Sequence, residues 1–220
     1  MAMKPATAWL IVILLCLSTP ALARRHRKAT SRGPATFDYY LLSLSWAPTY
    51  CGEHPADHSS ECRAGNHTAF VLHGLWPSSN RDPMKPMNCG MGSPVAARIV
   101  RHMLEYFPSK GLIHHEWQKH GMCSGLTANQ YFAQVERAYT SVRVPQRYRR
   151  LDHAQSVGVH EIEQDFAQAN NTLAGSFRVS CHAGELVGVE VCMDKNLHYQ
   201  ACPRTARECR SDQVTLAAPR

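Results

Sequence analysis

The apolar residues of this chain fall into a few short runs separated by polar and turn-forming residues. Aromatic and apolar residues with partial alternation fill 37–46 (FDYYLLSLSW) and 69–76 (AFVLHGLW), and both stretches predict β-strands. Two further runs, 177–181 (FRVSC) and 185–193 (ELVGVEVCM), flank a His-Ala-Gly turn and predict a β-hairpin.

Helical spacing of apolar residues occurs between these strand signals. It predicts helices over 94–107 and over 128–142, and a proline follows each of them. Thr127 and Gln130 form a Thr-x-x-Gln capping box at the start of the second helix. A third helix is predicted over about 159–169.

Strands near both ends of the chain, with helices between them, predict an α+β fold and argue against alternating βαβ units. We expect one disulfide-stabilised domain over residues 37–220, in which an antiparallel β-sheet packs with several α-helices. The chain shows no internal repeat, and its length suits a single domain with a substantial core.

The N-terminal residues predict export. Lys4 precedes an apolar run at 8–17, and residues 21–23 (Ala-Leu-Ala) give a small-x-small cleavage pattern, so residues 1–23 are interpreted as a secretory signal peptide. The apolar run is too short to cross a bilayer comfortably. Residues 24–36 are basic and rich in small residues, and we interpret them as a disordered leader. We therefore expect an exported mature protein without a membrane anchor.

Eight cysteines follow the expected signal peptide. An even number in an exported chain favours four disulfides over a metal cluster or a redox pair. The spacing suggests the following pairs, although spacing alone leaves other pairings open: Cys51 with Cys62, Cys89 with Cys123, Cys181 with Cys209, and Cys192 with Cys202.

The chain is basic, with a formal net charge of +7 and a pI of about 9.0. A basic exported protein is compatible with a polyanionic substrate, because cationic groups attract it and displace its counterions. Much of the excess lies in two runs, 24–28 and 143–150, and such runs are more often solvated surface than binding sites. Charge alone therefore decides little.

The segment HHEWQKHGMCSG (114–125) concentrates groups that transfer protons or hold anions. On a helix, Glu116 and His120 stand four residues apart, as do His115 and Lys119, so these four side chains cover one broad face. Such a face supplies an imidazole that moves a proton near neutral pH, a carboxylate to orient it and an ammonium to hold an anion.

A hydrolytic zinc site is one alternative for this segment. The His-Glu-x-x-His pattern of zinc peptidases places two histidines four residues apart on one face of a helix. Here His115 and His120 are five apart, about 140° around the helix, and His114 gives no better pair with His120. The spacing therefore argues against a metal-dependent phosphodiesterase, and we expect neither a metal nor a cofactor.

A second imidazole comes from HGLWP (73–77), where His73 lies at the end of a predicted strand. Alone, such a histidine is more often structural. Together with the cluster around His120, it completes the groups needed to cleave a phosphodiester by a neighbouring hydroxyl. One imidazole takes the proton of the ribose 2′-OH and the other protonates the departing 5′-oxygen. The residues alone do not decide which histidine is the acid.

The segments HGLWP and HEWQKHGMC, in this order and about forty residues apart, closely resemble the two catalytic segments of the ribonuclease T2 family. SLSWAPTYC (43–51) and YFPS (106–109) are also similar to that family, and the likeness runs over about 39–202. The SLSW sequence and the compact length favour the bacterial, periplasmic branch. The resemblance implies a monomeric endoribonuclease that cleaves single-stranded RNA through a 2′,3′-cyclic phosphate.

The resemblance also implies roles for individual residues. His73 would protonate the leaving oxygen, and His120 would take the 2′-OH proton. Glu116 and Lys119 would polarise the phosphate and stabilise the pentacovalent transition state, and His115 would help to bind it. A non-catalytic, secreted RNA-binding or toxin-like protein on the same fold is the alternative, but it would not need this set of groups.

Three features of the resemblance concern structure as well as chemistry. Trp76 is either a stacking surface for a base or a core residue. The Cys89–Cys123 pair matches a disulfide that would clamp the end of the second segment. Met122 stands where the family usually has threonine, which affects a hydrogen bond at that position and not the groups that transfer protons.

Overall fold

The protein is described by a computed structural model that covers residues 36–80, 87–90, 93–203 and 209–220. The expected signal peptide, 1–23, and the expected leader up to residue 35 lie outside these residues. The strands are β1 Tyr39–Trp46, β2 Phe70–Ser78, β3 Gln155–Gly158, β4 Phe177–His182, β5 Glu185–Met193 and β6 Gln213–Leu216. The helices are α1 Ala47–Glu53, α2 Ala97–Met103, α3 Lys110–Lys119, α4 Ala128–Ser141 and α5 Val159–Ala169.

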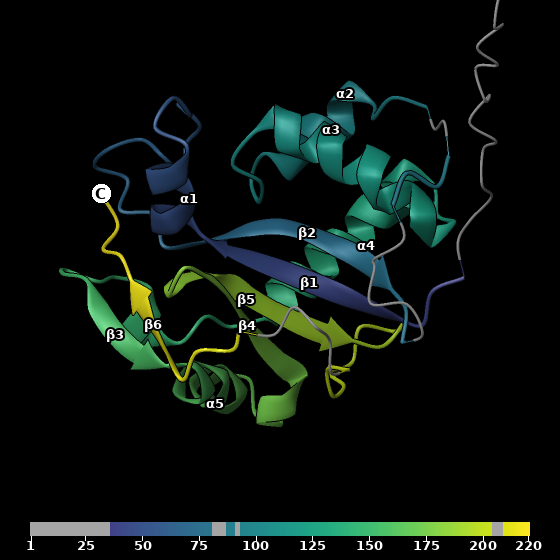
Figure 1. The fold of residues 1–220 in the computed structure, drawn as a ribbon. Helices are drawn as coiled ribbons and strands as arrows, with labels where there is room; N and C mark the ends of the chain where they lie inside the picture. Colours follow the sequence, from purple (N-terminus) through teal and green to yellow (C-terminus); the bar gives the residue numbers. More distant parts are fainter. Residues whose placement is uncertain (1–35, 81–86, 91–92, 204–208) are drawn as a thin grey trace, which may run out of the picture. The chain divides into compact units, whose positions relative to one another are not determined.

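The strands form one sheet in the order β2-β1-β5-β6-β3, and β4 pairs with β5 beside this path (Figure 1). The pairings are antiparallel except between β5 and β6, which meet in parallel at Glu185 and Thr215. The α+β class is confirmed, and this single parallel contact makes the sheet mixed. This contact could not be predicted, because the sequence around Glu185 and Thr215 gives no sign of which distant strand each residue pairs with.

The hairpin of β4 and β5 forms as predicted. Its turn places Ala183 and Gly184 at positive φ, at 49° and 83°, which is the backbone that tight hairpin turns require. The predicted helices over 128–142 and 159–169 are α4 and α5. Thr127 and Gln130 make the predicted capping box at the start of α4.

The helix predicted over 94–107 is shorter than expected, because α2 ends at Met103 and the chain continues in turns. Three elements were not predicted: α1, β3 and β6. Pro48 lies in the first turn of α1, where its missing N–H costs nothing and its fixed φ suits a helix. No helix among the described residues is long and apolar enough to cross a membrane.

The two faces of β1 have different surroundings. Leu42, Leu44 and Trp46 lie in the main hydrophobic core, which α4 covers behind the strands in Figure 1. Ser43 and Ser45 alternate with them and point to the opposite face. The candidate site lies on this second face, so alternate residues of β1 contact the hydrophobic core and the candidate site.

All four disulfides have the predicted pairing. Cys51–Cys62 closes the loop that leads from α1 towards β2, and Cys89–Cys123 fixes a loop to the turn after α3. The other two pairs join β4 and β5 to the C-terminal part of the chain. These bridges therefore hold segments on both sides of the candidate site.

Candidate active site

His73 lies on a β-bulge of the edge strand β2. Ser43 pairs with Gly74 and the next residue of β1, Leu44, pairs with Leu72, so His73 is the extra residue between them. A bulge twists the strand locally and redirects a side chain, and bulges are common beside active sites. Leu72 and Leu75 can therefore both face the core although they are three positions apart, an odd spacing that would place them on opposite faces of a regular strand, while His73 faces the site.

The imidazole of His73 has a polar group at each nitrogen. Its Nδ1 lies 2.9 Å from the hydroxyl of Ser45, and its Nε2 lies 3.6 Å from Oε1 of Glu116. The side chain keeps 38% of its exposure, whereas Glu116 is fully buried. The ring is thus held from two sides and still accessible to a substrate.

Helix α3 carries the second group of predicted site residues. It starts at the N-cap Ser109, whose side chain accepts a hydrogen bond from the backbone N–H of Leu112 at 3.1 Å. It ends at Lys119, so His120 lies just after the helix, with its backbone N–H bonded to the carbonyl of Glu116. The helix therefore ends one residue earlier than the expected face required, and the side chain of His120 is 95% buried just after the helix end.

Glu116 links the two segments. Its Oε2 accepts a hydrogen bond from the indole N–H of Trp76 at 2.6 Å, while its Oε1 faces His73. Gly74 makes room for this carboxylate, because a Cβ at that position would lie 1.9 Å from Oε2. The glycine of HGLWP is thus a requirement of close packing, which the sequence pattern alone did not reveal.

Trp76 contacts both histidines. Its ring centroid is 5.3 Å from that of His73 and 5.2 Å from that of His120. The side chain is 91% buried and packs with Tyr39 and Leu41. Both readings of this tryptophan are therefore relevant: it packs as a core residue and sets the spacing of the imidazoles, while stacking on a base stays a prediction.

His115 and Lys119 stand one turn apart on α3, at the margin of the site. Partial burial lowers the pKa of His115, and the positive charge of Lys119 lowers it further. The neutral imidazole of His115 is therefore favoured near neutral pH. The backbone carbonyl of Lys119 accepts a hydrogen bond from Asn88 at 2.9 Å, next to the Cys89–Cys123 disulfide, so the end of α3 is fixed in place.

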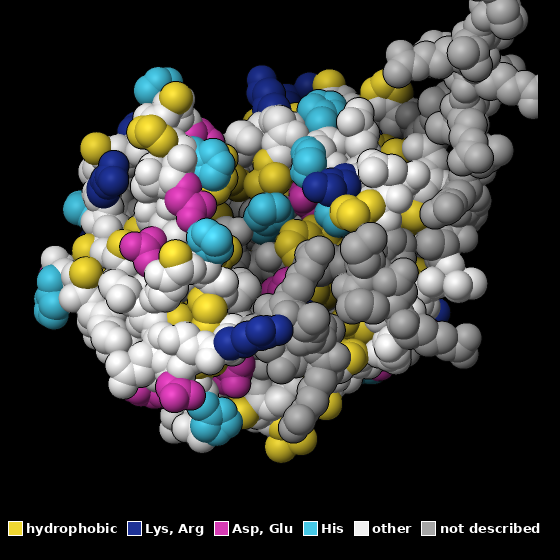
Figure 2. Space-filling model, in the orientation of Figure 1, with side chains coloured by type: hydrophobic (Ala, Val, Ile, Leu, Met, Phe, Trp, Pro, Cys, Tyr) yellow, Lys and Arg dark blue, Asp and Glu magenta, His cyan; other side chains and the backbone are white. Residues whose placement is uncertain are grey.

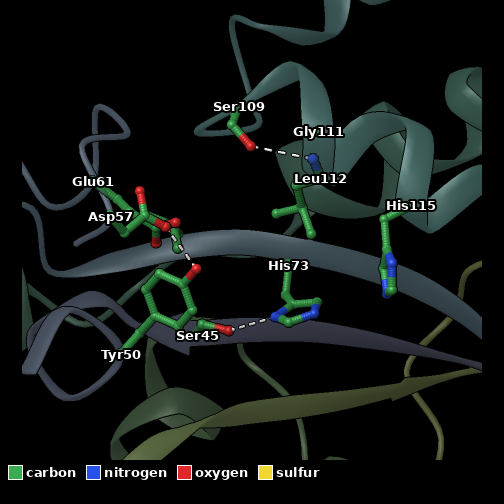
Figure 3. Close-up of a pocket in the computed structure, with 10 residues that line it drawn as sticks. Ser45, Tyr50, Asp57, Glu61, His73, Ser109, Gly111, Leu112 and His115 are labelled. Carbon is green, nitrogen blue, oxygen red and sulfur yellow. Dashed lines mark hydrogen bonds between the residues drawn. The ribbon is translucent and has the colours of Figure 1, made fainter. Parts of the chain in front are cut away.

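A pocket of about 430 Å³ lies beside His73, between the loop that follows α1 and the start of α3 (Figure 3). We call it the Asp57 pocket. The residues that matter below are Ser45, Tyr50, Asp57, Glu61, Leu112 and His115. The hydroxyl of Tyr50 donates to Asp57 at 2.7 Å. Tyr50, Asp57 and Glu61 were not predicted to be functional, because the 51–62 disulfide loop that carries the two acids has no recognisable motif.

Replacing Glu61 by glutamine should stabilise the protein at pH 8 and change little at pH 4. Burial, with a contribution from the charge of Asp57, raises the pKa of Glu61 from 4.5 to about 7. The folded state keeps a proton that the unfolded state releases, so the wild type loses stability as the pH rises between these values. Because the carboxyl is partly solvated, the expected gain is about 1 kcal/mol.

Urea unfolding of Glu61→Gln and wild type at both pH values measures this effect. Glu185→Gln is the matched control, because Glu185 is exposed on β5. A gain of equal size at pH 4 and pH 8 would contradict the proposed cause.

The site residues surround a hollow in one face of the molecule. Figure 2 shows several histidine side chains around this hollow, with hydrophobic side chains at its floor. Strand β2 supplies His73 and Trp76, α3 supplies Glu116, and His120 follows directly after α3. The structure therefore brings together residues that are about forty positions apart in the sequence, as the two motifs predicted.

Comparison with known proteins agrees with the resemblance to the ribonuclease T2 family. A model of the Ribonuclease T2 family matches residues 37–202. A protein of Aeromonas hydrophila named Ribonuclease is 38% identical over 95 residues, and the match covers 43% of this chain and 41% of that protein. Ribonuclease DdI of Dictyostelium discoideum is 28% identical over 189 residues, with 79% of this chain and 81% of that protein covered.

The fold is also found in solved structures. An RNase-related protein from Calystegia sepium superposes with a TM-score of 0.68 at 23% identity, over 84% of this chain and 98% of that one. The chain spans less than half the length of the Aeromonas hydrophila protein, 41%, and of a Probable ribonuclease of Haemophilus influenzae, 45%. The family model, however, spans most of this chain, from the start of β1 to Cys202. The chain therefore belongs to the ribonuclease T2 family.

Proposed function

We propose that this protein is an endoribonuclease that cleaves single-stranded RNA by transesterification through a 2′,3′-cyclic phosphate. The observation that carries the proposal is the arrangement of two imidazoles, His73 and His120, which come from separate segments and both contact Trp76. Glu116 is buried between the two segments and contacts His73 and Trp76. Two fixed imidazoles can act on the two sides of one phosphate.

In this proposal the nucleophile is the ribose 2′-OH of the substrate. His120 takes its proton, and His73, whose Nε2 faces the hollow beside Glu116, gives a proton to the departing 5′-oxygen. Lys119 and His115 bind the phosphate, and Lys119 with Glu116 stabilises the charge that grows on its oxygens. His120 gains one proton and His73 loses one, the bond from phosphorus to the 2′-oxygen forms as the bond to the 5′-oxygen breaks, and no oxidation state changes. The proposed reaction therefore needs no redox cofactor.

Relatives support this assignment. The curated proteins from Aeromonas hydrophila and Dictyostelium discoideum are both named as ribonucleases. Two structures with the same fold are titled as RNase MC1 variants in complex with 5′-UMP and 5′-GMP, each with a TM-score of 0.62. A nucleotide as ligand agrees with a substrate of single-stranded RNA here. We further propose that the leaving nucleoside occupies the Asp57 pocket, because this pocket adjoins His73.

The predicted signal peptide and the disulfides also bear on where the protein acts. The predicted signal peptide at 1–23 and the four disulfides both suit an oxidising compartment outside the cytosol. We propose that the mature protein is exported and acts as a monomer, in the bacterial periplasm or otherwise as a secreted enzyme.

Cleavage should require the 2′-OH and no metal ion. The purified, oxidised protein is incubated in EDTA with a labelled single-stranded RNA, and in parallel with the same oligomer carrying 2′-O-methyl groups throughout. We expect cyclic phosphate ends from the unmodified RNA and no products from the methylated strand. Cleavage of the methylated strand, or loss of activity in EDTA that added Mg²⁺ or Zn²⁺ restores, would instead support a metal-dependent phosphodiesterase. Binding of both strands without cleavage would support the non-catalytic alternative.

A further inference from the structure

A second hollow adjoins His73 and crosses the sheet from β2 over β1 and β5 to β4, with α1 at its side. Its volume is about 570 Å³, which is within the usual range for small-molecule sites. We call it the Thr49 groove. The residues used below are Ser43, Thr49, Glu53, Ser180, Val187 and Glu190. The proposed roles of the catalytic groups account for none of them.

Thr49 indicates that the groove holds a polar ligand. The residue is 96% buried in the first turn of α1, and its Oγ1 has no hydrogen-bond partner among the described residues. Buried hydroxyl groups are nearly always paired, because leaving one unsatisfied costs about 1–3 kcal/mol. Thr49 lines the groove, so a ligand there that reaches this hydroxyl would supply the missing partner.

The chemistry of the groove favours a nucleoside over a phosphate. No lysine or arginine is among the described residues that line it. It offers the hydroxyls of Ser43, Thr49 and Ser180 and the exposed carboxylate of Glu53. Glu190 also lines the groove, and its charge is compensated by Arg178, which donates two hydrogen bonds to its Oε2. A carboxylate such as that of Glu53 accepts hydrogen bonds from the amino groups of bases and repels phosphate. An uncharged nucleoside with an exocyclic amine therefore fits this lining.

The position of the groove indicates which nucleoside it would take. The groove and the Asp57 pocket share Ser45, Tyr50 and His73, so they are adjacent to each other at the group that we assign as the acid. His73 acts on the leaving oxygen, so both hollows lie on the leaving side of the scissile phosphate. If the Asp57 pocket holds the leaving nucleoside, the groove lies next along the strand.

We infer that the Thr49 groove is a binding subsite for the nucleoside that follows the leaving nucleotide in the RNA strand, with preference for a base that carries an exocyclic amine. The inference rests on the proposed ribonuclease function. It extends the proposed site from the two nucleotides of the broken bond to a third, and it predicts that longer substrates react faster.

The test uses substrates that contain a single ribonucleotide, so that one bond alone is cleaved. The first is ribouridine followed by one deoxyadenosine whose 3′-phosphate is capped as a methyl ester. The second carries one more deoxyadenosine in place of the methyl group, so both have a phosphodiester at this position and differ by a nucleoside and not by a charge at the groove. We expect kcat/KM of the wild type to be about tenfold higher for the longer substrate, as for a few charge-assisted hydrogen bonds.

Two variants should remove this preference and leave cleavage of the shorter substrate within twofold of wild type. Ser180→Trp fills the groove from β4, and Thr49→Val removes the unpaired hydroxyl at nearly constant volume. Ser141→Trp on α4 is the matched control, because Ser141 is exposed and lies outside the groove. This control should keep the full preference.

The outcomes separate the two proposals. Equal rates for both substrates in the wild type, or a preference that persists in Ser180→Trp and Thr49→Val, would overturn the subsite. Absence of cleavage of either substrate would overturn the ribonuclease function. In that case fluorescence anisotropy of a labelled deoxyadenosine trinucleotide tests the groove alone: weaker binding to Ser180→Trp than to Ser141→Trp would support it, and equal binding would overturn it.

Discussion

Replacement of His73 or His120 by alanine should lower kcat/KM for single-stranded RNA by about 10³-fold, which lies within the range for general acid–base groups. In the proposed mechanism, each variant removes one of the two proton-transfer groups. His73 is held by Ser45 and faces Glu116, and His120 is buried beside Trp76. Initial rates on a fluorogenic RNA substrate, with the thermal midpoint as a measure of folding, test both variants.

The matched control is His114→Ala. His114 precedes His115 on α3 and has no part in the proposed chemistry. We expect its kcat/KM to stay within about threefold of wild type. If either His73→Ala or His120→Ala keeps near wild-type turnover in a folded protein, the assignment of that histidine is wrong. If both do, the chain is not an enzyme of the proposed type, and the binding alternative becomes the better account.

The fold was predictable where local patterns determine it. Alternating apolar residues located β1, β2 and the hairpin of β4 and β5, and a capping box located the start of α4. The short strands β3 and β6 were missed because each has only four residues and gains its stability from the other. Their pairing joins segments about sixty residues apart, and no local signal marks such a contact.

The sequence predicts the candidate site as a set of residues but not as a geometry. Two motifs of rare residue types identified His73 and the cluster on α3, and the structure brings them together around Trp76. The bulge that aims His73 could not be predicted, because it depends on how Ser43 and Leu44 pair with β2. Spacing on an ideal helix also placed His120 on α3, whereas the helix ends one residue earlier.

The hollows beside His73 show a further limit of sequence motifs. Asp57 and Glu61 lie in a disulfide loop, and Thr49 lies in a helix that was not predicted. None of these residues belongs to either motif. Motifs mark the groups that react, and these are few and fixed in type. Groups that contact the rest of a strand can vary, so they become visible only when the surface around the reacting groups is known.

Replacing Gly74 by alanine should reduce kcat/KM by about 10²-fold and lower the free energy of unfolding by about 2 kcal/mol, as overpacking does elsewhere. The added Cβ would lie 1.9 Å from Oε2 of Glu116 and 2.8 Å from Nε1 of Trp76. The buried carboxylate must then move, and its hydrogen bond to Trp76 and its approach to His73 change together. Gly175→Ala is the control, since a Cβ there meets no atom within 4 Å.

A double-mutant cycle identifies the cause of this loss. Glu116→Ala removes the carboxylate that the new methyl group would meet, so adding Gly74→Ala to that variant should cost much less stability than in the wild type. Urea unfolding of the four proteins gives the coupling energy, which we expect to exceed about 1 kcal/mol. If Gly74→Ala costs the same with and without the carboxylate, the glycine is needed for the strand or for Trp76. In that case the packing of Glu116 against β2 does not explain the glycine in the first motif.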